Sequence, residues 1–233
     1  FDDRQQDERL SLLLKELDGL PPDGGEPFAR GLSLRLDLGD RVIVRGPNGC
    51  GKSSLLRTLL GLWNPTTGVA ALPEGDLFVL PQRPYLLATA SIEQLLLYPR
   101  TRADWNVSDD ALRAALEWAG LEAKGANLTT PGAAGGLSGG EKQRLVAARL
   151  WLTCEDGRPP ALALLDEPTA ACEAEFERKL FDYIVSQQLS TVTISHSELL
   201  TRYHTHQLLL DGHGRWVVDV LSSVRCCAAR AVR

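Results

Sequence analysis

The sequence contains no methionine among its 233 residues and begins at Phe1. Because translation starts at methionine, we expect this sequence to be a piece of a longer polypeptide. It also lacks a signal peptide and any apolar run near the roughly 18–20 residues that a transmembrane helix requires. We therefore expect no membrane-spanning helix within these residues.

Positive charge and paired cysteines are also scarce. The 25 Lys and Arg residues are outnumbered by 30 Asp and Glu, and the net charge of −5 gives no electrostatic basis for binding nucleic acid. The cysteines are odd in number and lack metal-ligand spacing, which indicates a reducing compartment without a disulfide framework. They are Cys50, Cys154, Cys172, Cys226 and Cys227. The length and the 44% apolar content suit one substantial globular domain.

The segment Gly46–Ser53 fits the phosphate-loop pattern G-x-x-x-x-G-K-[ST] at every fixed position. Residues 41–45 before it read as a strand, and residues 53–60 after it read as a helix. Glycines let backbone N–H groups approach a polyphosphate, and the helix N-terminus adds unpaired N–H groups. Lys52 would bridge the outer phosphates, and the Ser53 hydroxyl would bind Mg²⁺. The alternative is a glycine-rich turn with only a structural role. The strand, the loop, the Lys and the Ser all stand where a phosphate loop requires them, which favours phosphate binding.

Two acids close an apolar strand further along the chain. Asp166 ends this strand and is placed to hold Mg²⁺, and Glu167 stands where a general base could activate water. A solvated turn is the usual explanation of such a pair, but the preceding phosphate loop favours the chemical one. Gln82 follows a short strand and could reach the metal or the water. His196 also follows a strand, where a lone histidine is more often structural.

The segment Leu137–Arg144 places Ser138, Gly139 and Gly140 at the start of a helix that we expect to run to about Leu152. A helix N-terminus of this kind can bind an anion. The chain therefore carries a second candidate anion site beside the phosphate loop.

Apolar patterning predicts strands and helices on both sides of a helical middle part. Residues 32–38 alternate in polarity as a half-buried strand does, whereas residues 161–165 are continuously apolar, as in a buried parallel strand. Residues 191–195 read as another strand. Residues 64–68 read as a loop. The pattern predicts an α/β fold with a parallel sheet, antiparallel strands near its N-terminus and a helical insertion.

Five motifs in this order resemble the nucleotide-binding domain of ABC transporters. They are Walker A (Gly46–Ser53), the Q-loop (Gln82), the signature motif (Leu137–Arg144), Walker B with the catalytic Glu (Leu162–Glu167) and the H-loop (His196). The resemblance implies a P-loop NTPase (RecA-like) core with a parallel sheet, an N-terminal antiparallel β subdomain and an inserted α-helical signature subdomain. Residues 10–82 and 153–220 would form the core with its β subdomain, residues 83–152 the helical subdomain and residues 221–233 a C-terminal tail.

The resemblance also implies an ATPase with ATP and Mg²⁺ as cofactors. Glu167, His196 and Gln82 would be catalytic, and Ser53, Gln82 and Asp166 would hold the metal. The nucleotide would be bound by Asn48, Gly49, Cys50, Gly51, Lys52, Ser53 and Ser54. Two such domains would face each other, identical or not, so that Ser138, Gly139 and Gly140 act on the partner's nucleotide.

Four runs further resemble the peroxisomal fatty-acyl (D-type) half-transporters and their bacterial relatives: residues 46–54, 61–63, 81–85 and 203–206. In that group a transmembrane domain precedes the nucleotide-binding domain in one polypeptide. The resemblance implies a lipid-like or acyl cargo and a nucleotide-binding domain on the cytoplasmic side of a membrane. A peroxisomal or a bacterial inner membrane would fit, and nucleic acid is not an expected partner.

Two positions depart from the family pattern. An aromatic residue that stacks on adenine usually precedes Walker A, and here the region offers only Phe28. The D-loop, usually Ser-Ala-Leu-Asp, reads Ala170-Ala171-Cys172-Glu173. The alternative function is a soluble ABC-type ATPase acting on ribosomes or DNA, but such proteins carry paired cassettes or long coiled coils, and this sequence shows neither.

Overall fold

The computed structural model describes residues 10–21 and 24–221. The chain divides into two compact units. The first comprises residues 1–77, 161–166 and 184–233, and the second comprises residues 78–160 and 167–183. The predicted division, with residues 83–152 as an inserted subdomain, stays a prediction.

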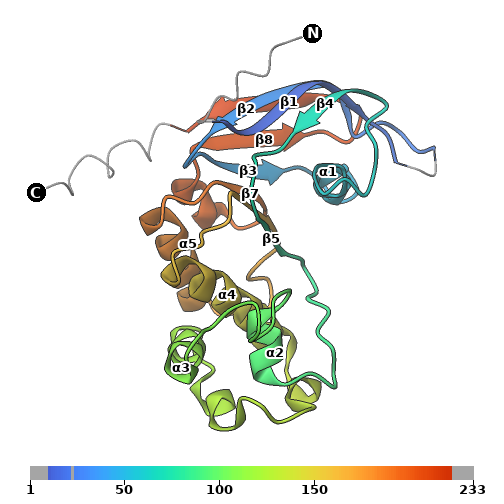
Figure 1. The fold of residues 1–233 in the computed structure, drawn as a ribbon. Coiled ribbons are helices and arrows are strands. Elements are labelled where there is room, and N and C mark those ends of the chain that lie inside the picture. The colour runs from blue at the N-terminus through green and yellow to red at the C-terminus, as the bar shows by residue number, and fades with distance from the viewer. Residues whose placement is uncertain (1–9, 22–23, 222–233) are drawn as a thin grey trace, which may run out of the picture. The chain divides into compact units, whose positions relative to one another are not determined.

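The first unit contains an antiparallel three-stranded sheet of order β2-β1-β4 (Figure 1). Its strands are β1 (Leu10–Gly19), β2 (Ala29–Asp37) and β4 (Thr67–Ala71). The alternating leucines of β2 point to one face, which is buried, while the residues between them are exposed. The antiparallel subdomain predicted near the N-terminus is therefore confirmed.

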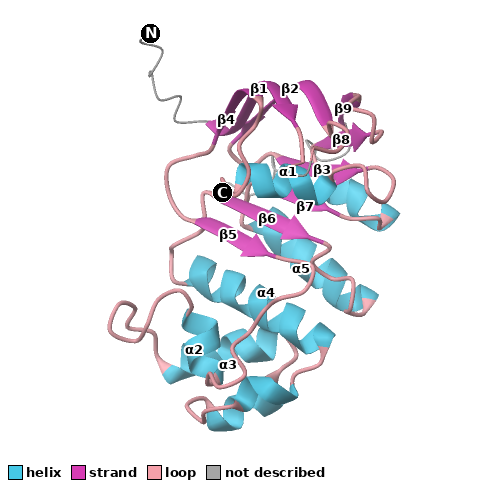
Figure 2. Ribbon diagram, turned by 90° about the vertical axis from the view of Figure 1, so that its right-hand side faces the viewer, coloured by secondary structure: helices cyan, strands magenta, loops and turns pink. Residues whose placement is uncertain are grey.

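A largely parallel sheet forms the rest of the first unit, and Figure 2 shows its strands as neighbouring arrows. Strands β6 (Leu162–Asp166), β7 (Thr191–Ile194), β3 (Arg41–Arg45) and β8 (His206–Leu210) pair in parallel, and β9 (Trp216–Val220) joins β8 antiparallel. Every residue of β7 is buried, as are the first four residues of β3 and of β6, as expected for central strands of a parallel sheet. Helix α1 (Lys52–Leu59) follows β3 directly, and the 3₁₀ helix η3 spans Glu198–Tyr203.

The second unit is mainly helical. Strand β5 (Leu77–Leu80) leads the chain into it, and its helices include α2 (Ile92–Leu97), α3 (Asp109–Trp118), α4 (Gly139–Glu155) and most of α5 (Ala174–Ser186). Two short 3₁₀ helices, η1 (Glu122–Asn127) and η2 (Ala133–Gly136), precede α4. Helix α4 packs against both α2 and α3.

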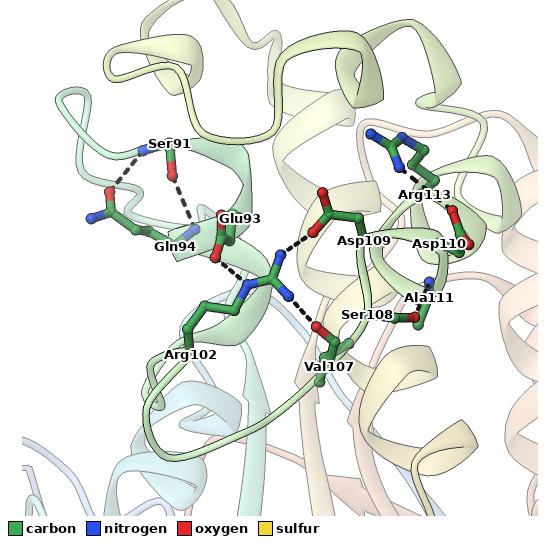
Figure 3. Close-up of polar contacts among 10 residues, drawn as sticks. All are labelled: Ser91, Glu93, Gln94, Arg102, Val107, Ser108, Asp109, Asp110, Ala111 and Arg113. Carbon is green, nitrogen blue, oxygen red and sulfur yellow. Dashed lines mark hydrogen bonds and ion pairs between the residues drawn. The ribbon is translucent and has the colours of Figure 1, made fainter.

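Side-chain caps define where these helices begin. Ser91 and Gln94 form a capping box at α2, and the Ser108 hydroxyl accepts from the Ala111 N–H at α3. Figure 3 shows Arg102 between these two helix starts, where it donates to Glu93, to Asp109 and to a backbone carbonyl. This arginine fastens the loop between α2 and α3 to both helices.

Three elements differ from the sequence-based expectation. Residues 64–68 are not all loop, because β4 begins at Thr67 and pairs with β1, with Val69 opposite Lys15. Strand β9 was not predicted either. Strand β4, Thr-Gly-Val-Ala-Ala, contains a Gly and two Ala residues of weak strand propensity, so its pairing with β1 decides its conformation. Helix α4 also runs to Glu155, three residues beyond the expected end.

Candidate functional site

The phosphate loop connects β3 to α1 and depends on its glycines for close packing. Gly46 has a φ of 148°, and a Cβ atom there would lie 2.2 Å from the Leu210 carbonyl oxygen and 2.6 Å from the Cys50 sulfur. Gly51 has a φ of 99°, and a Cβ atom there would lie 2.0 Å from the Cβ of Phe28. Other residues at either position would be strained and would clash with their neighbours. The glycine pattern is thus required by the fold of the loop itself.

The Lys52 ammonium lies inside this loop. Its Nζ donates to the carbonyl oxygens of Gly46 at 2.8 Å and Pro47 at 2.9 Å, and the residue is only 9% exposed. Asn48 and Gly49 at the tip of the loop are exposed, whereas Cys50 is buried. The cation is therefore held at the loop by two neutral acceptors, which the oxygens of an anion can replace.

The N-terminus of α1 has no side-chain cap. Gly51 occupies the N-cap position, and the first turn contains no acidic residue. The first N–H groups of a helix lack intrahelical acceptors and, with the helix dipole, favour an anion. Ser53 is exposed and Ser54 is half-buried in this first turn.

Asp166 ends β6 beside the start of α1. Burial raises the pKa of its carboxyl group, while a hydrogen bond with Ser53 and the charges of Arg57 and Lys52 oppose that rise. Mg²⁺ prefers a few protein oxygens and completes its octahedron with water and phosphate oxygens. The hydroxyl of Ser53 and the carboxylate of Asp166 fit that donor set. Among residues 10–21 and 24–221, no three His, Cys, Asp or Glu side chains gather as a metal cluster.

The predicted residues of the second unit surround the start of α4. Ser138 is the N-cap of this helix, and its Oγ accepts from the Glu141 N–H at 3.2 Å while Glu141 accepts from the Ser138 N–H at 2.8 Å. Because the Ser138 hydroxyl acts as an acceptor in this capping box, its own hydrogen is not used by the cap. Ser138 and Gly139 are exposed, so this helix end is open to a ligand or partner.

Gln82, Glu167 and His196 occupy three loops. The Gln82 side chain is exposed after β5, and the His196 side chain is exposed after β7 in the first unit. Glu167 is half-buried and has a φ of 45°, an uncommon value for a residue other than glycine. The structure thus brings Lys52, Ser53 and Asp166 together in the first unit, and places Gln82, Glu167 and Ser138 in the second.

The D-loop segment packs on the start of α4. A Cβ atom on Gly140 would lie 2.4 Å from the Ala171 carbonyl oxygen, so only glycine fits there. A cavity of about 400 Å³ adjoins these residues within the second unit, lined by Gln82, Arg83, Pro84, Gly139, Lys142, Gln143, Ala170 and Ala171.

One residue that the sequence analysis did not single out stands at the centre of this region. Gln143 is 2% exposed and makes four polar contacts with the Q-loop, the Walker B end and the D-loop. Gln143 falls within the signature motif Leu137–Arg144, but nothing in the motif indicated which backbone groups its amide would contact.

Phe28, the aromatic residue considered for base stacking, belongs to the core of the first unit. It is 3% exposed, and its ring covers Gly19, where a Cβ atom would lie 2.0 Å from the ring. Its backbone N–H donates to the Gly19 carbonyl at 2.9 Å. Its ring is therefore used in packing.

A family model described as "ABC transporter" matches residues 29–170, more than half of the chain. The chain belongs to the ABC transporter family. The chain is an ATPase domain of this family.

Two curated relatives illustrate the subfamily. The chain is 36% identical over 203 residues to ATP-binding cassette sub-family D member 1 of Drosophila melanogaster, covering 82% of this chain and 27% of the relative. It is 34% identical over 205 residues to human ATP-binding cassette sub-family D member 3, covering 84% and 30%. The predicted resemblance to D-type transporters is confirmed, and the chain spans less than a third of these relatives' length.

The fold agrees with solved structures of the same family. A bacterial Atm1-family ABC exporter with ATP bound superposes with a TM-score of 0.71 at 25% identity, covering 88% of this chain and 38% of the exporter. The predicted P-loop NTPase fold is thereby confirmed. None of the helices within residues 10–21 and 24–221 has the length and apolarity to cross a bilayer.

Proposed function

We propose that this chain binds ATP together with Mg²⁺ and hydrolyses it to drive a transmembrane domain. The observation that carries the proposal is the convergence of Lys52, Ser53 and Asp166 around the uncapped start of α1. A cation, a hydroxyl, a carboxylate and free helix N–H groups are the groups that a metal-bound polyphosphate requires.

Each of these residues has a distinct role in the proposed reaction. The Lys52 ammonium exchanges its contacts with Gly46 and Pro47 for phosphate oxygens. Ser53 and Asp166 hold the metal, with Gln82 as a further ligand, and Mg²⁺ when bound neutralises charge on the phosphates. Glu167 accepts a proton from the attacking water, and His196 is a second catalytic group near the terminal phosphate.

Two copies of the domain complete the site in this proposal. Ser138, Gly139 and Gly140 present an exposed helix start to the nucleotide of a partner domain, which is identical or related. The support for this arrangement is that Ser138 and Gly139 are exposed at the start of α4, outside the phosphate loop of their own chain. ATP would close the dimer, and hydrolysis would open it.

The remaining parts of the proposal follow from the D-type relatives. A transmembrane domain in the same full-length polypeptide would receive the movement, with this domain on the cytoplasmic side of a peroxisomal or bacterial inner membrane.

The proposed cargo is lipid-like or acyl. One relative, at 33% identity, is named as the human lysosomal cobalamin transporter, so cobalamin is the competing cargo. ATPase stimulation of the reconstituted full-length protein by acyl-CoA, with cobalamin in parallel, decides between them.

Hydrolysis is tested with paired variants of the chain. Glu167→Gln should keep ATP binding and lower kcat by about 10²–10⁴-fold, the range for a lost general base. Lys52→Ala should weaken ATP binding itself, because it removes the cation that meets the phosphates.

Glu117→Gln and Lys15→Ala, which change exposed residues on α3 and β1, are the matched controls and should behave as wild type. Fluorescent-nucleotide titration and phosphate release report the two quantities. Wild-type turnover in Glu167→Gln would show that Glu167 is not the general base. Wild-type nucleotide affinity in Lys52→Ala would show that Lys52 does not bind the phosphates.

A further inference from the structure

Gln143 lies one turn into α4 with its amide fully enclosed. Its Nε2 donates to the Gln82 carbonyl oxygen and to the Glu167 carbonyl oxygen, each at 3.1 Å. Its Oε1 accepts from the Ala171 N–H at 3.0 Å and lies 3.6 Å from the Cys172 sulfur, a weak donor. All five residues belong to the second unit. One side chain thus joins the Q-loop, the residue after Walker B and the D-loop.

The contacts use the whole hydrogen-bonding capacity of a primary amide. The group has two N–H donors and two acceptor sites on oxygen, and here both donors meet carbonyls while the oxygen meets an N–H and a thiol. Burial makes each of these contacts hard to give up, because a lost partner would leave a polar group without water. Glutamate has the same size but cannot donate twice, and asparagine is one methylene shorter.

The contact with Glu167 bears on the proposed base. The left-handed backbone of Glu167, with φ 45°, persists only where its surroundings hold it. Its carbonyl oxygen accepts from the Ala170 N–H at 3.2 Å and from Gln143 at 3.1 Å. Of these two donors, Gln143 is the one that links the Glu167 backbone to a rigid helix. Releasing it would let the peptide of Glu167 rotate and carry the carboxylate with it.

We propose that Gln143 is a positioning residue for ATP hydrolysis: it fixes the backbone of Glu167, and that of Gln82, against the start of α4. This inference rests on the proposed role of Glu167 as the general base. A shift of about 1 Å in a reacting group lowers a rate by as much as about 10²-fold, so the position of this carbonyl matters for turnover. Nucleotide binding at the phosphate loop does not depend on it.

The test replaces the amide while keeping its size. Gln143→Glu places a carboxyl oxygen against the two carbonyls, and we expect kcat to fall by about tenfold or more with KM and the fluorescent-ATP Kd within about threefold of wild type. Gln187→Glu makes the same chemical change at an exposed position after α5 and should behave as wild type. Gln143→Ala is the second variant, since it removes the amide without adding a charge.

A double-mutant cycle separates positioning from general structural support. If Gln143 acts through Glu167, adding Gln143→Ala to Glu167→Gln should lower the residual single-turnover rate by less than about twofold. A full multiplicative loss in the double variant would overturn the inference, as would a folded Gln143→Ala with kcat within about twofold of wild type.

A measurement on the unmodified chain covers the case in which both variants unfold. The Ala171 amide should exchange slowly with deuterium, because it donates to the buried Gln143 side chain at 3.0 Å. Exchange as fast as that of an unstructured peptide would overturn the proposal. Absence of ATPase activity in wild type would instead contradict the proposed function, so the two failures are distinguishable.

Discussion

The Cβ of Phe28 lies directly against Gly51, so that a Cβ atom on Gly51 would approach it to 2.0 Å. The phosphate loop therefore rests on a buried aromatic residue that enters the core just before β2. Phe28, which the sequence offered as a base-stacking residue, therefore supports the phosphate loop by packing against Gly51.

Phe28→Ala should therefore act on stability. Removing a buried phenylalanine ring typically costs about 3–5 kcal/mol of unfolding free energy, because the cavity left behind is only partly refilled. Denaturant titration should show this loss, with Phe28→Leu giving a smaller one. The folded fraction of Phe28→Ala should retain nearly wild-type ATP affinity. A large loss of affinity without a loss of stability would show that the ring meets the base.

Base discrimination should be weak. Since Phe28 is buried, binding energy in the proposed site comes mainly from the phosphates and the metal. We expect GTP to compete with ATP within about tenfold, a difference of roughly 1.4 kcal/mol. Competition of unlabelled GTP and ATP against one fluorescent nucleotide measures the ratio. A preference for ATP of about a hundredfold or more would reveal a base-reading group.

Dimerisation should depend on ATP and on Ser138. In the Glu167→Gln background, which we expect to bind ATP without hydrolysing it rapidly, the chain should shift from monomer to dimer in sedimentation. Ser138→Arg should abolish this shift by adding bulk and charge at an exposed helix start that is proposed to face the partner's phosphates. Gln187→Arg adds the same group at an exposed site elsewhere and should still dimerise. A dimer that forms equally well with Ser138→Arg would contradict the proposed arrangement.

Asp166 should lower the stability of the ligand-free chain at neutral pH. Burial raises the pKa of its carboxyl above the ordinary value of 3.8, so the folded state holds the proton more tightly than the unfolded chain. The stabilisation that comes from this tighter proton binding is therefore fully present below pH 3.8. It is lost as the pH rises through the folded pKa, where the buried carboxyl must ionise.

Asp166→Asn removes this charge and should raise Tm at neutral pH, with the difference shrinking in acid. Asp182→Asn, on the exposed face of α5, is the control. The same Asp166→Asn chain should gain less Tm than wild type from Mg²⁺ with ATP. Equal or lower stability of Asp166→Asn at neutral pH would show that the carboxylate is not penalised by its burial.

The local parts of the fold were predictable because their signals are short-range. The alternating leucines of β2, the apolar run before Asp166 and the Ser91 and Ser108 caps each specify an element from neighbouring residues alone. Strand β4 was not predictable in this way, because its Gly and Ala residues become a strand only by pairing with β1.

The amino-acid sequence by itself determined the family and the identity of the chemical groups, since the phosphate loop, Asp166, Glu167 and the stretch at Ser138 are contiguous motifs. The tertiary structure alone decided which residues serve those groups from elsewhere in the chain. Phe28 is buried under Gly51, and Gln143 reaches carbonyls 61 and 24 residues away. Packing and buried hydrogen bonds join residues by distance in space, which the order of residues along the chain does not record.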